Sequence, residues 1–197
     1  MYYLEKQVES KIIIDRSEFI GILTPISDTK EIPEILKSIR KKYPKANHYV
    51  TAYVLDNTQG SNDDGEPSGT AGVPVLEILN VHQLKNVLAV VVRYFGGIKL
   101  GAGGLIRAYA KSASDVISHA SLLEKILMHN YEITFTYDLI SKIDHIFNDY
   151  VTDKSYLSDV TYTLSFKSNM ELLDEHAYLF KSIKNQGTKE VLVPWKK

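Results

Sequence analysis

The stretch VLAVVVRYFGGIKLGAGGLIRAY, residues 87–109, carries the pattern that decides the fold. It opens with six consecutive apolar residues, as a buried strand does. A loop with five glycines follows, and a helical spacing of apolar residues begins within that loop. We therefore expect a strand over 86–94, a glycine-rich connection, and an amphipathic helix over 104–120.

The residues before this stretch predict further strands and helices. Asp28 and Glu31 have the spacing of a capping box, and Pro44 cannot continue the helix that they begin. Asp15 and Arg16 interrupt an alternating apolar pattern, which indicates a turn between two strands. The expected elements are two strands within 8–24, a helix between 28 and 44, a strand over 48–55, a polar loop over 56–69 and a short helix over 70–81.

The pattern changes after residue 120, where the order becomes β-α-β-β-α-β, the ferredoxin-like plan. The expected elements are a strand over 128–137, a helix over 138–150, strands over 151–157 and 160–167, a helix over 170–185 and a last strand over 188–194. We place the boundary near Tyr131. The predicted fold class is α+β, with a larger domain over 1–130 and a ferredoxin-like domain over 131–197.

Composition limits the partners that the whole molecule can attract. The formal net charge is −1 over 197 residues, so steering toward nucleic acid or a membrane requires a local patch. The chain has no cysteine, which removes disulfides, thiolate nucleophiles and cysteine metal sites and fits a reducing compartment. The longest purely apolar run is six residues, against roughly 20 for a membrane span. We expect a cytoplasmic protein with no membrane partner.

The glycine loop is a candidate site for phosphate or another anion. Backbone N–H groups at the start of a helix point outward and favour negative charge, and glycine lets a ligand approach closely. From Ile78 to Ser114 there are five Lys or Arg and no acid. The candidate phosphate- or nucleic-acid-binding residues are Arg93, Gly96, Gly97, Lys99, Gly101, Gly103, Gly104, Arg107 and Lys111. The alternative is that the glycines only allow close packing and the cations are solvated.

Two familiar nucleotide motifs do not fit this loop. Gly96 and Gly101 have the glycine spacing of a Walker A loop, but Ala102 and Gly103 stand where that loop needs Lys and Ser or Thr. Ile106 replaces the third glycine of the dinucleotide-binding pattern. The sequence therefore predicts neither a nucleotide hydrolase loop nor a dinucleotide cofactor, and we expect no cofactor.

An acidic stretch, NDDGEPSGTAGVP over 62–74, is the second candidate site. Its carboxylates could hold a metal, form a docking surface, or pin the two loops together by pairing Asp63 or Glu66 with Arg93 or Arg107. Alternatively, Asp64-Gly65 forms a turn, and Ser68 or Thr70 caps the helix that follows. The candidate residues are Asp63, Asp64, Glu66, Ser68 and Thr70. No established metal-ligand spacing is present, and we expect no metal; His48 is best explained as a hydrogen-bonded structural residue.

The two stretches together resemble the signature of the Impact/YigZ family. The matching segments are DDGEPSGTAGVPVLEIL over 63–79 and VVVRYFGGIKLGAGGLIRAY over 90–109, in that order. The resemblance extends over roughly residues 1–125 and includes SEFIGILTPI and NHYVTAYVL. The remaining residues are similar to the small C-terminal domain of bacterial members.

The resemblance implies a ribosomal protein S5 domain 2-like fold for the first domain. For the second it implies a ferredoxin-like fold akin to a domain of translation elongation factor G. It also implies a link to translation, because eukaryotic Impact proteins are translational regulators that associate with ribosomes. The family has no established catalytic residues to transfer to this chain, so the catalytic residues are unknown.

Three functions are consistent with the sequence. The first is a non-enzymatic RNA- or ribosome-binding regulator of translation. The second is a protein-interaction module that docks a protein partner through the DDGEPSGT and GGIKLGAGG segments. The third is a metal-dependent phosphoester hydrolase, in which the acidic stretch holds the metal and the glycine loop holds the phosphate.

Overall fold

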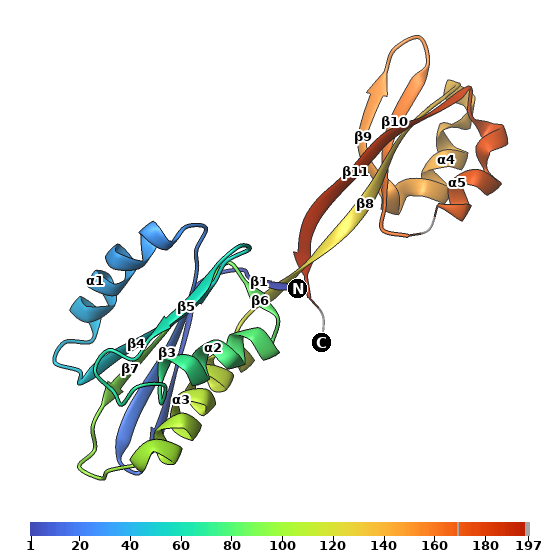
Figure 1. Ribbon diagram of the computed structural model, residues 1–197. Coiled ribbons are helices and arrows are strands. Elements are labelled where there is room, and N and C mark those ends of the chain that lie inside the picture. Colours follow the sequence, from blue (N-terminus) through green and yellow to red (C-terminus); the bar gives the residue numbers. More distant parts are fainter. Residues whose placement is uncertain (169, 196–197) are drawn as a thin grey trace. The chain divides into compact units, whose positions relative to one another are not determined.

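The computed structural model describes residues 1–168 and 170–195, so the residues at 169, 196 and 197 within the second predicted domain lie outside the description. The chain has mixed α+β structure with two sheets (Figure 1). It divides into two compact units. Unit 1 comprises Met1–Glu124 together with Pro194 and Trp195, and unit 2 comprises Lys125–Val193.

Unit 1 is built on a five-stranded antiparallel sheet. The strand order is β2 (Val8–Ile14), β3 (Ser17–Pro25), β7 (Val87–Tyr94), β4 (His48–Val54) and β5 (Gln59–Asn62). Strand β7 is central, and its Val91 pairs with Gly21 on one side and Val50 on the other. The apolar run therefore fills the middle of the sheet.

Helices cover both faces of this sheet, as Figure 1 shows. Helices α2 (Gly72–Val81) and α3 (Gly101–Ser118) pack on the face that includes Val87, Ala89 and Val91. Helix α1 (Ile32–Lys42), preceded by a 3-10 turn η1 (Thr29–Glu31), packs on the face that includes Leu88, Val90 and Val92. Because successive strand residues face opposite layers, the part of β7 that both layers cover, residues 87–92, is apolar at every position.

Several expected elements of unit 1 are confirmed. Asp15 and Arg16 form the turn between β2 and β3 with φ of 44° and 64°. The capping box of Asp28 and Glu31 is present, because each side chain accepts a hydrogen bond from the backbone of the other end. Strands β4 and β7 and helix α2 lie within two residues of their expected ends. Helix α1 ends two residues before the expected Pro44, but it begins at Ile32, because the turn after Asp28 is the 3-10 turn η1.

Other features of unit 1 differ from expectation. The polar loop over 56–69 contains strand β5, which pairs with β4. Two short strands, β1 (Tyr2–Leu4) and β6 (Leu84–Lys85), pair with each other, and β1 also pairs with Leu122–Glu124. Helix α3 begins at Gly101 rather than 104. Short or polar edge strands carry no apolar alternation, and glycine is tolerated in a first helical turn.

Unit 2 has the expected order of strands and helices. Its elements are β8 (Leu122–Phe135, shared with unit 1), η2 (Tyr137–Leu139), α4 (Ile140–Phe147), η3 (Asn148–Tyr150), β9 (Val151–Tyr156), β10 (Val160–Phe166), α5 (Glu171–Glu175), η4 (Ala177–Leu179) and β11 (Ser182–Pro194). The strands lie in the order β9-β10-β8-β11. Alternate residues of β10 are fully buried with Phe147 and Leu173, so this strand forms the centre of the core.

The second helix of unit 2 is shorter than expected. Only Glu171–Glu175 is α-helical, and the chain forms a strand from Ser182 instead of continuing as a helix to 185. The Lys181 N–H already donates to the Thr134 carbonyl of β8, so pairing with a long neighbouring strand replaces helical bonds. The division between the units falls after Glu124, earlier than the boundary placed near Tyr131.

Within the described residues, we find no helix with both the length and the hydropathy that crossing a bilayer requires.

Candidate functional site

A buried ion pair joins the acidic stretch to the end of β7. Glu66 and Arg93 are only 9% and 5% exposed, and Arg93 Nη1 donates to Glu66 Oε1 at 2.5 Å. The Tyr109 hydroxyl of α3 donates to the same oxygen at 2.8 Å. Burial and this hydrogen bond raise the pKa of the Tyr109 phenol, so the phenol stays protonated and remains a donor. The carboxylate therefore links three segments: the acidic stretch, β7 and α3.

The guanidinium of Arg93 is held in a fixed position. Its Nη2 donates to Ser17 Oγ at 3.5 Å, and its Cζ lies 5.3 Å from the Phe19 ring centroid and 5.6 Å from that of Phe95. Its Nε is a buried side-chain nitrogen with no hydrogen-bond partner among the described residues. An unsatisfied buried donor is unusual and costs free energy, so this atom calls for a physical explanation.

Asp63 caps the start of α2. Its Oδ1 accepts from the backbone N–H of Gly72 at 2.7 Å and of Ala71 at 3.1 Å, and its Oδ2 accepts from Gly69 at 2.8 Å. Burial alone would raise the pKa of the carboxyl, but these three donors outweigh it and hold the pKa below its usual range. Asp63 is therefore a structural anion of the acidic stretch.

Asp64 is also bound within the protein. Its Oδ2 accepts from the Tyr49 N–H at 2.7 Å, and its Oδ1 pairs with Arg40 at 3.1 Å. Its carbonyl oxygen lies 2.8 Å from Nδ1 of His48, whose Nε2 is 3.7 Å from Glu66 Oε1. His48 is thus hydrogen-bonded at the edge of the ion pair.

The hydroxyls of the acidic stretch differ in exposure. The buried Thr70 donates to the Pro67 carbonyl at 2.6 Å, whereas Ser68 is exposed. Among the described residues, no three His, Asp or Glu side chains lie close enough together to hold a metal ion. Because Asp63 and Asp64 are bound to backbone groups, their carboxylates do not converge on one point as metal ligands would.

The first part of the glycine loop is bonded internally. The Phe95 N–H donates to Asn47 Oδ1 at 2.8 Å, and the Gly96 N–H donates to Ser17 Oγ at 3.2 Å. A Cβ at Gly96 would lie 2.0 Å from the carbonyl carbon of Arg16, so only glycine fits there. Gly96 therefore allows close packing, and its N–H is not free for the anion contact that the sequence predicts. Arg93 Nη1 likewise donates to Glu66 and not to a bound phosphate.

The second part of the loop opens onto a pocket of about 310 Å³. We call it the Phe95 pocket; it is lined by Glu66, Pro67, Arg93, Phe95, Lys99, Leu100, Gly101, Ala102 and Leu105. Helix α3 starts here, with no acidic residue in its first turn and no capping side chain. Gly101 has φ of 67°, a left-handed conformation that suits glycine. The pocket thus combines apolar walls with the positive end of a helix dipole.

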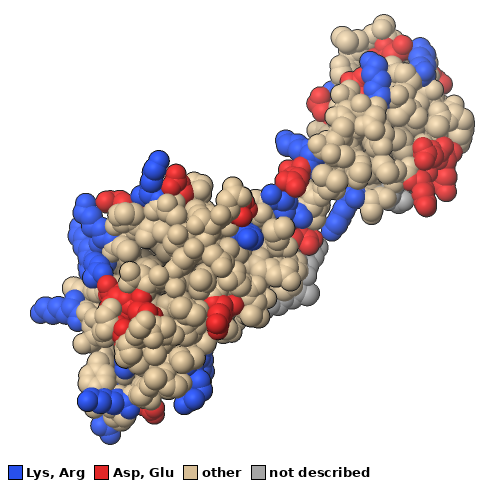
Figure 2. All heavy atoms as spheres, in the orientation of Figure 1, with Lys and Arg blue, Asp and Glu red and all other residues tan. Residues whose placement is uncertain are grey.

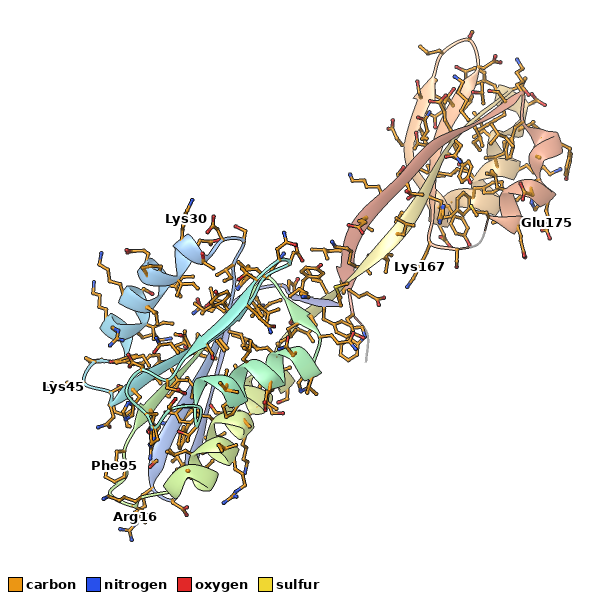
Figure 3. The ribbon with its side chains drawn as sticks, in the orientation of Figure 1. Arg16, Lys30, Lys45, Phe95, Lys167 and Glu175 are labelled. Carbon is orange, nitrogen blue, oxygen red and sulfur yellow. The ribbon has the colours of Figure 1, made fainter. Side chains whose placement is uncertain are left out.

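Four exposed cations come from the β2–β3 turn, the glycine loop and α3, and we call Arg16, Lys99, Arg107 and Lys111 the cationic rim. Within the described residues, none of the four forms an ion pair. Arg107 Nη1 lies 3.5 Å from where a Cβ of Gly103 would be, which keeps its charge near the first turn of α3. Figure 3 shows Arg16 at the same end of unit 1 as Phe95, and Figure 2 shows Lys and Arg side chains projecting around that end.

A second hollow lies beside the Phe95 pocket. Arg107 and Lys111 line it together with Asp15, and Leu100 lines both hollows. The rim and the pocket therefore share one surface. The acidic Asp15 lowers the positive potential of the second hollow without pairing with either cation in the described residues.

The structure brings the two candidate stretches together through Glu66 and Arg93. Of the other predicted residues, Lys99 and Gly101 line the Phe95 pocket, and Arg107, Lys111 and Gly104 line the second hollow. Gly97 is exposed with φ of 84°, and Gly103 is exposed in the first turn of α3. Ser17, Phe95, Leu105 and Tyr109 are not among the site residues that the sequence predicts. Phe95 lies in a glycine-rich loop, and binding residues are frequent on loops, so its position is a signal that could have identified it.

Comparison with known proteins identifies the family of the chain. The sequence model of the Impact N-terminal domain matches residues 15–117, just over half of the 197 residues. That range includes both stretches that form the buried ion pair. The chain belongs to the Impact family.

Individual relatives agree with membership of the Impact family. IMPACT family member YvyE of Bacillus subtilis is 41% identical over 183 residues, which cover 90% of this chain and 83% of that protein. IMPACT family member YigZ of Escherichia coli is 35% identical over 136 residues, which cover 66% of this chain and 67% of that protein. A crystal structure of a hypothetical protein aligns over 100% of this chain and 97% of its own, with a TM-score of 0.60 and 25% identity.

Proposed function

We propose that this Impact family chain binds RNA by contacts between phosphates and the cationic rim, and that it regulates translation by binding the ribosome. This proposal rests on the observation that Arg107 and Lys111 lie exposed on α3 without an ion-pair partner in the described residues. They line a hollow with Leu100 and Gly104 from the uncapped start of that helix. Cations that are not neutralised by protein carboxylates are available to phosphate, and the helix dipole adds to their attraction.

The role in translation rests on family membership, since translational regulation is what the family resemblance implies. On the same basis we propose that unit 1 has a ribosomal protein S5 domain 2-like fold and that unit 2 is ferredoxin-like. The strand order β9-β10-β8-β11 and the alternation of strands and helices in unit 2 support the second assignment. Binding to ribosomes implies a cytoplasmic location.

Sedimentation with ribosomes across a salt series tests the proposal. Phosphate contacts release counterions, so the sedimented fraction should fall steeply as salt rises. The variant R107E/K111E should bind more weakly at low salt, because two attractive contacts become repulsive. A matched control is K30E/K41E, which reverses two exposed cations of η1 and α1 and should bind as the wild type does. No sedimentation of the wild type at low salt, or unchanged binding by R107E/K111E, would contradict the proposal.

A second candidate function, docking of a protein partner, is favoured by exposed apolar residues at the same end of unit 1. Phe95, Ile98 and Ile106 are 46%, 41% and 41% exposed. Exposed apolar side chains close together are frequent in protein interfaces. A partner retained after nuclease treatment and lost with I98S/I106S would favour docking over RNA binding. Loss of all partners after nuclease treatment would exclude it.

A further inference from the structure

We propose that the Phe95 pocket binds one unstacked base of single-stranded RNA, with the phosphate of that nucleotide at the amino terminus of α3. The inference deepens the proposed function and rests on it for the RNA. The walls and the charge of the pocket support nucleotide binding independently of a longer RNA, so the pocket can be tested with a mononucleotide.

The walls of the pocket suit a flat ring. Phe95, Leu100 and Leu105 supply apolar surface, and the Phe95 ring is 46% exposed at the end of β7. Nucleic acid bases stack on exposed aromatic side chains whatever their sequence, because every base has a π face. A volume of about 310 Å³ lies at the lower end of the range for small-ligand pockets and is sufficient for one base.

The guanidinium of Arg93 places a positive charge beside the aromatic wall. Arg93 lines the pocket, and its Cζ lies 5.6 Å from the Phe95 ring centroid. A base that stacks on Phe95 therefore lies close to this charge, which attracts the carbonyl oxygens and ring nitrogens of a base.

The charge of the pocket suits one phosphate. Arg93 and Lys99 carry positive charge against the single negative charge of Glu66, which Arg93 and Tyr109 already bind. Gly101 and Ala102 line the pocket at the first turn of α3, an 18-residue helix. A helix start of this kind binds phosphate through its outward N–H groups and its dipole.

The neighbouring hollow offers a path for the RNA strand that leaves the Phe95 pocket. Leu100 lines both hollows, so a strand leaving the Phe95 pocket passes Leu100 and reaches Arg107 and Lys111. A base in a duplex is paired and stacked and cannot enter such a pocket, whereas the bases of a single strand can be splayed out. The site therefore selects single-stranded over double-stranded RNA, while the cationic rim binds the phosphates of both.

Titration with uridine 5′-monophosphate, followed by NMR, tests the pocket. The nucleotide should shift the amide signals of Gly101 and Ala102 together with the ring signals of Phe95. Inorganic phosphate should shift the amides alone, and uridine should shift the ring more than the amides. Equal shifts with phosphate and nucleotide, or shifts that fall elsewhere in the chain, would overturn the proposal.

A second experiment compares single-stranded and duplex RNA of one sequence. Phe95→Ala should weaken single-strand binding about tenfold and leave duplex binding and the salt dependence unchanged. Ile98→Ala, a control at an exposed apolar residue of the same loop, should stay within about twofold of the wild type. Equal weakening of both RNAs by Phe95→Ala, or none, would overturn the pocket. If no RNA binds at any salt, the proposed function fails, and the mononucleotide titration still decides the pocket.

Discussion

Glu66 illustrates how single residues hold the site together. A buried carboxylate is costly to desolvate, and here its cost is offset because Arg93 and Tyr109 both donate to one oxygen. Removal of one partner leaves the other charge buried and uncompensated. The residue therefore governs the stability of the contact between the acidic stretch and β7, and through it the position of the Phe95 pocket.

Glu66→Ala should lower the free energy of unfolding by about 3 to 5 kcal/mol, because Arg93 would remain buried without its counterion. Urea denaturation followed by circular dichroism measures the change. Glu77→Ala on the exposed side of α2 is the control and should stay within about 0.5 kcal/mol of the wild type. A Glu66→Ala protein as stable as the control would show that the pair does not hold the loop.

Asp63→Asn should destabilise the protein in a pH-dependent way. The folded pKa of Asp63 is lowered, so its contribution is present above the unfolded pKa of about 4 and is lost as pH falls through the folded pKa. We expect a loss of about 1 kcal/mol at pH 7, typical of a helix cap, and a smaller difference from the wild type at pH 3. Denaturation at both pH values measures it. A difference that grows toward pH 3 would contradict the assignment.

The sequence alone predicts an ion pair between the two stretches but does not identify its members. It allows Asp63 or Glu66 to pair with Arg93 or Arg107, and the structure contains the pair of Glu66 with Arg93. Which carboxylate turns inward depends on the local turn, because Asp63 is held by the backbone of Gly69 and Gly72. Tyr109 lies within the predicted helix, but its hydrogen bond could not be predicted, because its partner Glu66 is distant in sequence.

At the scale of elements, the connection between β7 and α3 shapes the pocket. Gly96 packs against the turn between β2 and β3, and Gly101 starts α3 in a left-handed conformation. These two constraints fix where the loop leaves the sheet and where the helix begins. The exposed position of Phe95 between β7 and α3 follows from them.

Gly96→Ala should destabilise unit 1 more than Gly97→Ala does. A Cβ at Gly96 meets backbone atoms of Arg16, which cannot move without displacing the turn, whereas a Cβ at Gly97 meets nothing within 4 Å. Gly97→Ala carries only the cost of a positive φ, about 1 to 2 kcal/mol. Thermal and urea denaturation of both variants measure the order. Equal losses would mean that backbone conformation, and not close packing, is what Gly96 provides.

Elements with a strong apolar period could be predicted, and those held by pairing alone could not. Strand β7 has a continuous apolar run because both of its faces are buried, and helix α3 has an apolar face because one side of it packs on the sheet. Strand β5 consists of polar and small residues at a sheet edge, so nothing in its side chains indicates pairing. Helix α5 is shorter than the apolar pattern predicts for a different reason. The apolar residues after it continue a helical spacing, but that segment pairs with β8 instead of extending the helix.

At the scale of the whole molecule, the chain ends contribute to unit 1. The Trp195 N–H donates to the Leu122 carbonyl at 2.9 Å, and its ring makes an edge contact with Tyr2 at 5.0 Å between centroids. Trp195 is the single tryptophan of the chain, so its fluorescence reports on the environment of unit 1.

Trp195→Ala should destabilise unit 1 by about 2 kcal/mol and leave unit 2 unchanged, because a partly buried ring loses less than a fully buried one. Hydrogen exchange resolved by residue measures the two units separately. Leu157→Ala, at a side chain that is 78% exposed in unit 2, is the control and should change neither unit by more than about 0.5 kcal/mol. Loss of protection confined to unit 2 would contradict the assignment of Trp195 to unit 1.

The net charge of −1 means that the whole molecule does not attract RNA, so binding depends on the local charge of the cationic rim. The most direct measurement is the slope of log affinity against log salt for a single-stranded RNA. If Arg107 and Lys111 each contact a phosphate, R107E/K111E should weaken binding and reduce the slope by about 1.4, and K30E/K41E should leave the slope unchanged. Equal slopes for the wild type and R107E/K111E would contradict the central claim that RNA phosphates bind the cationic rim.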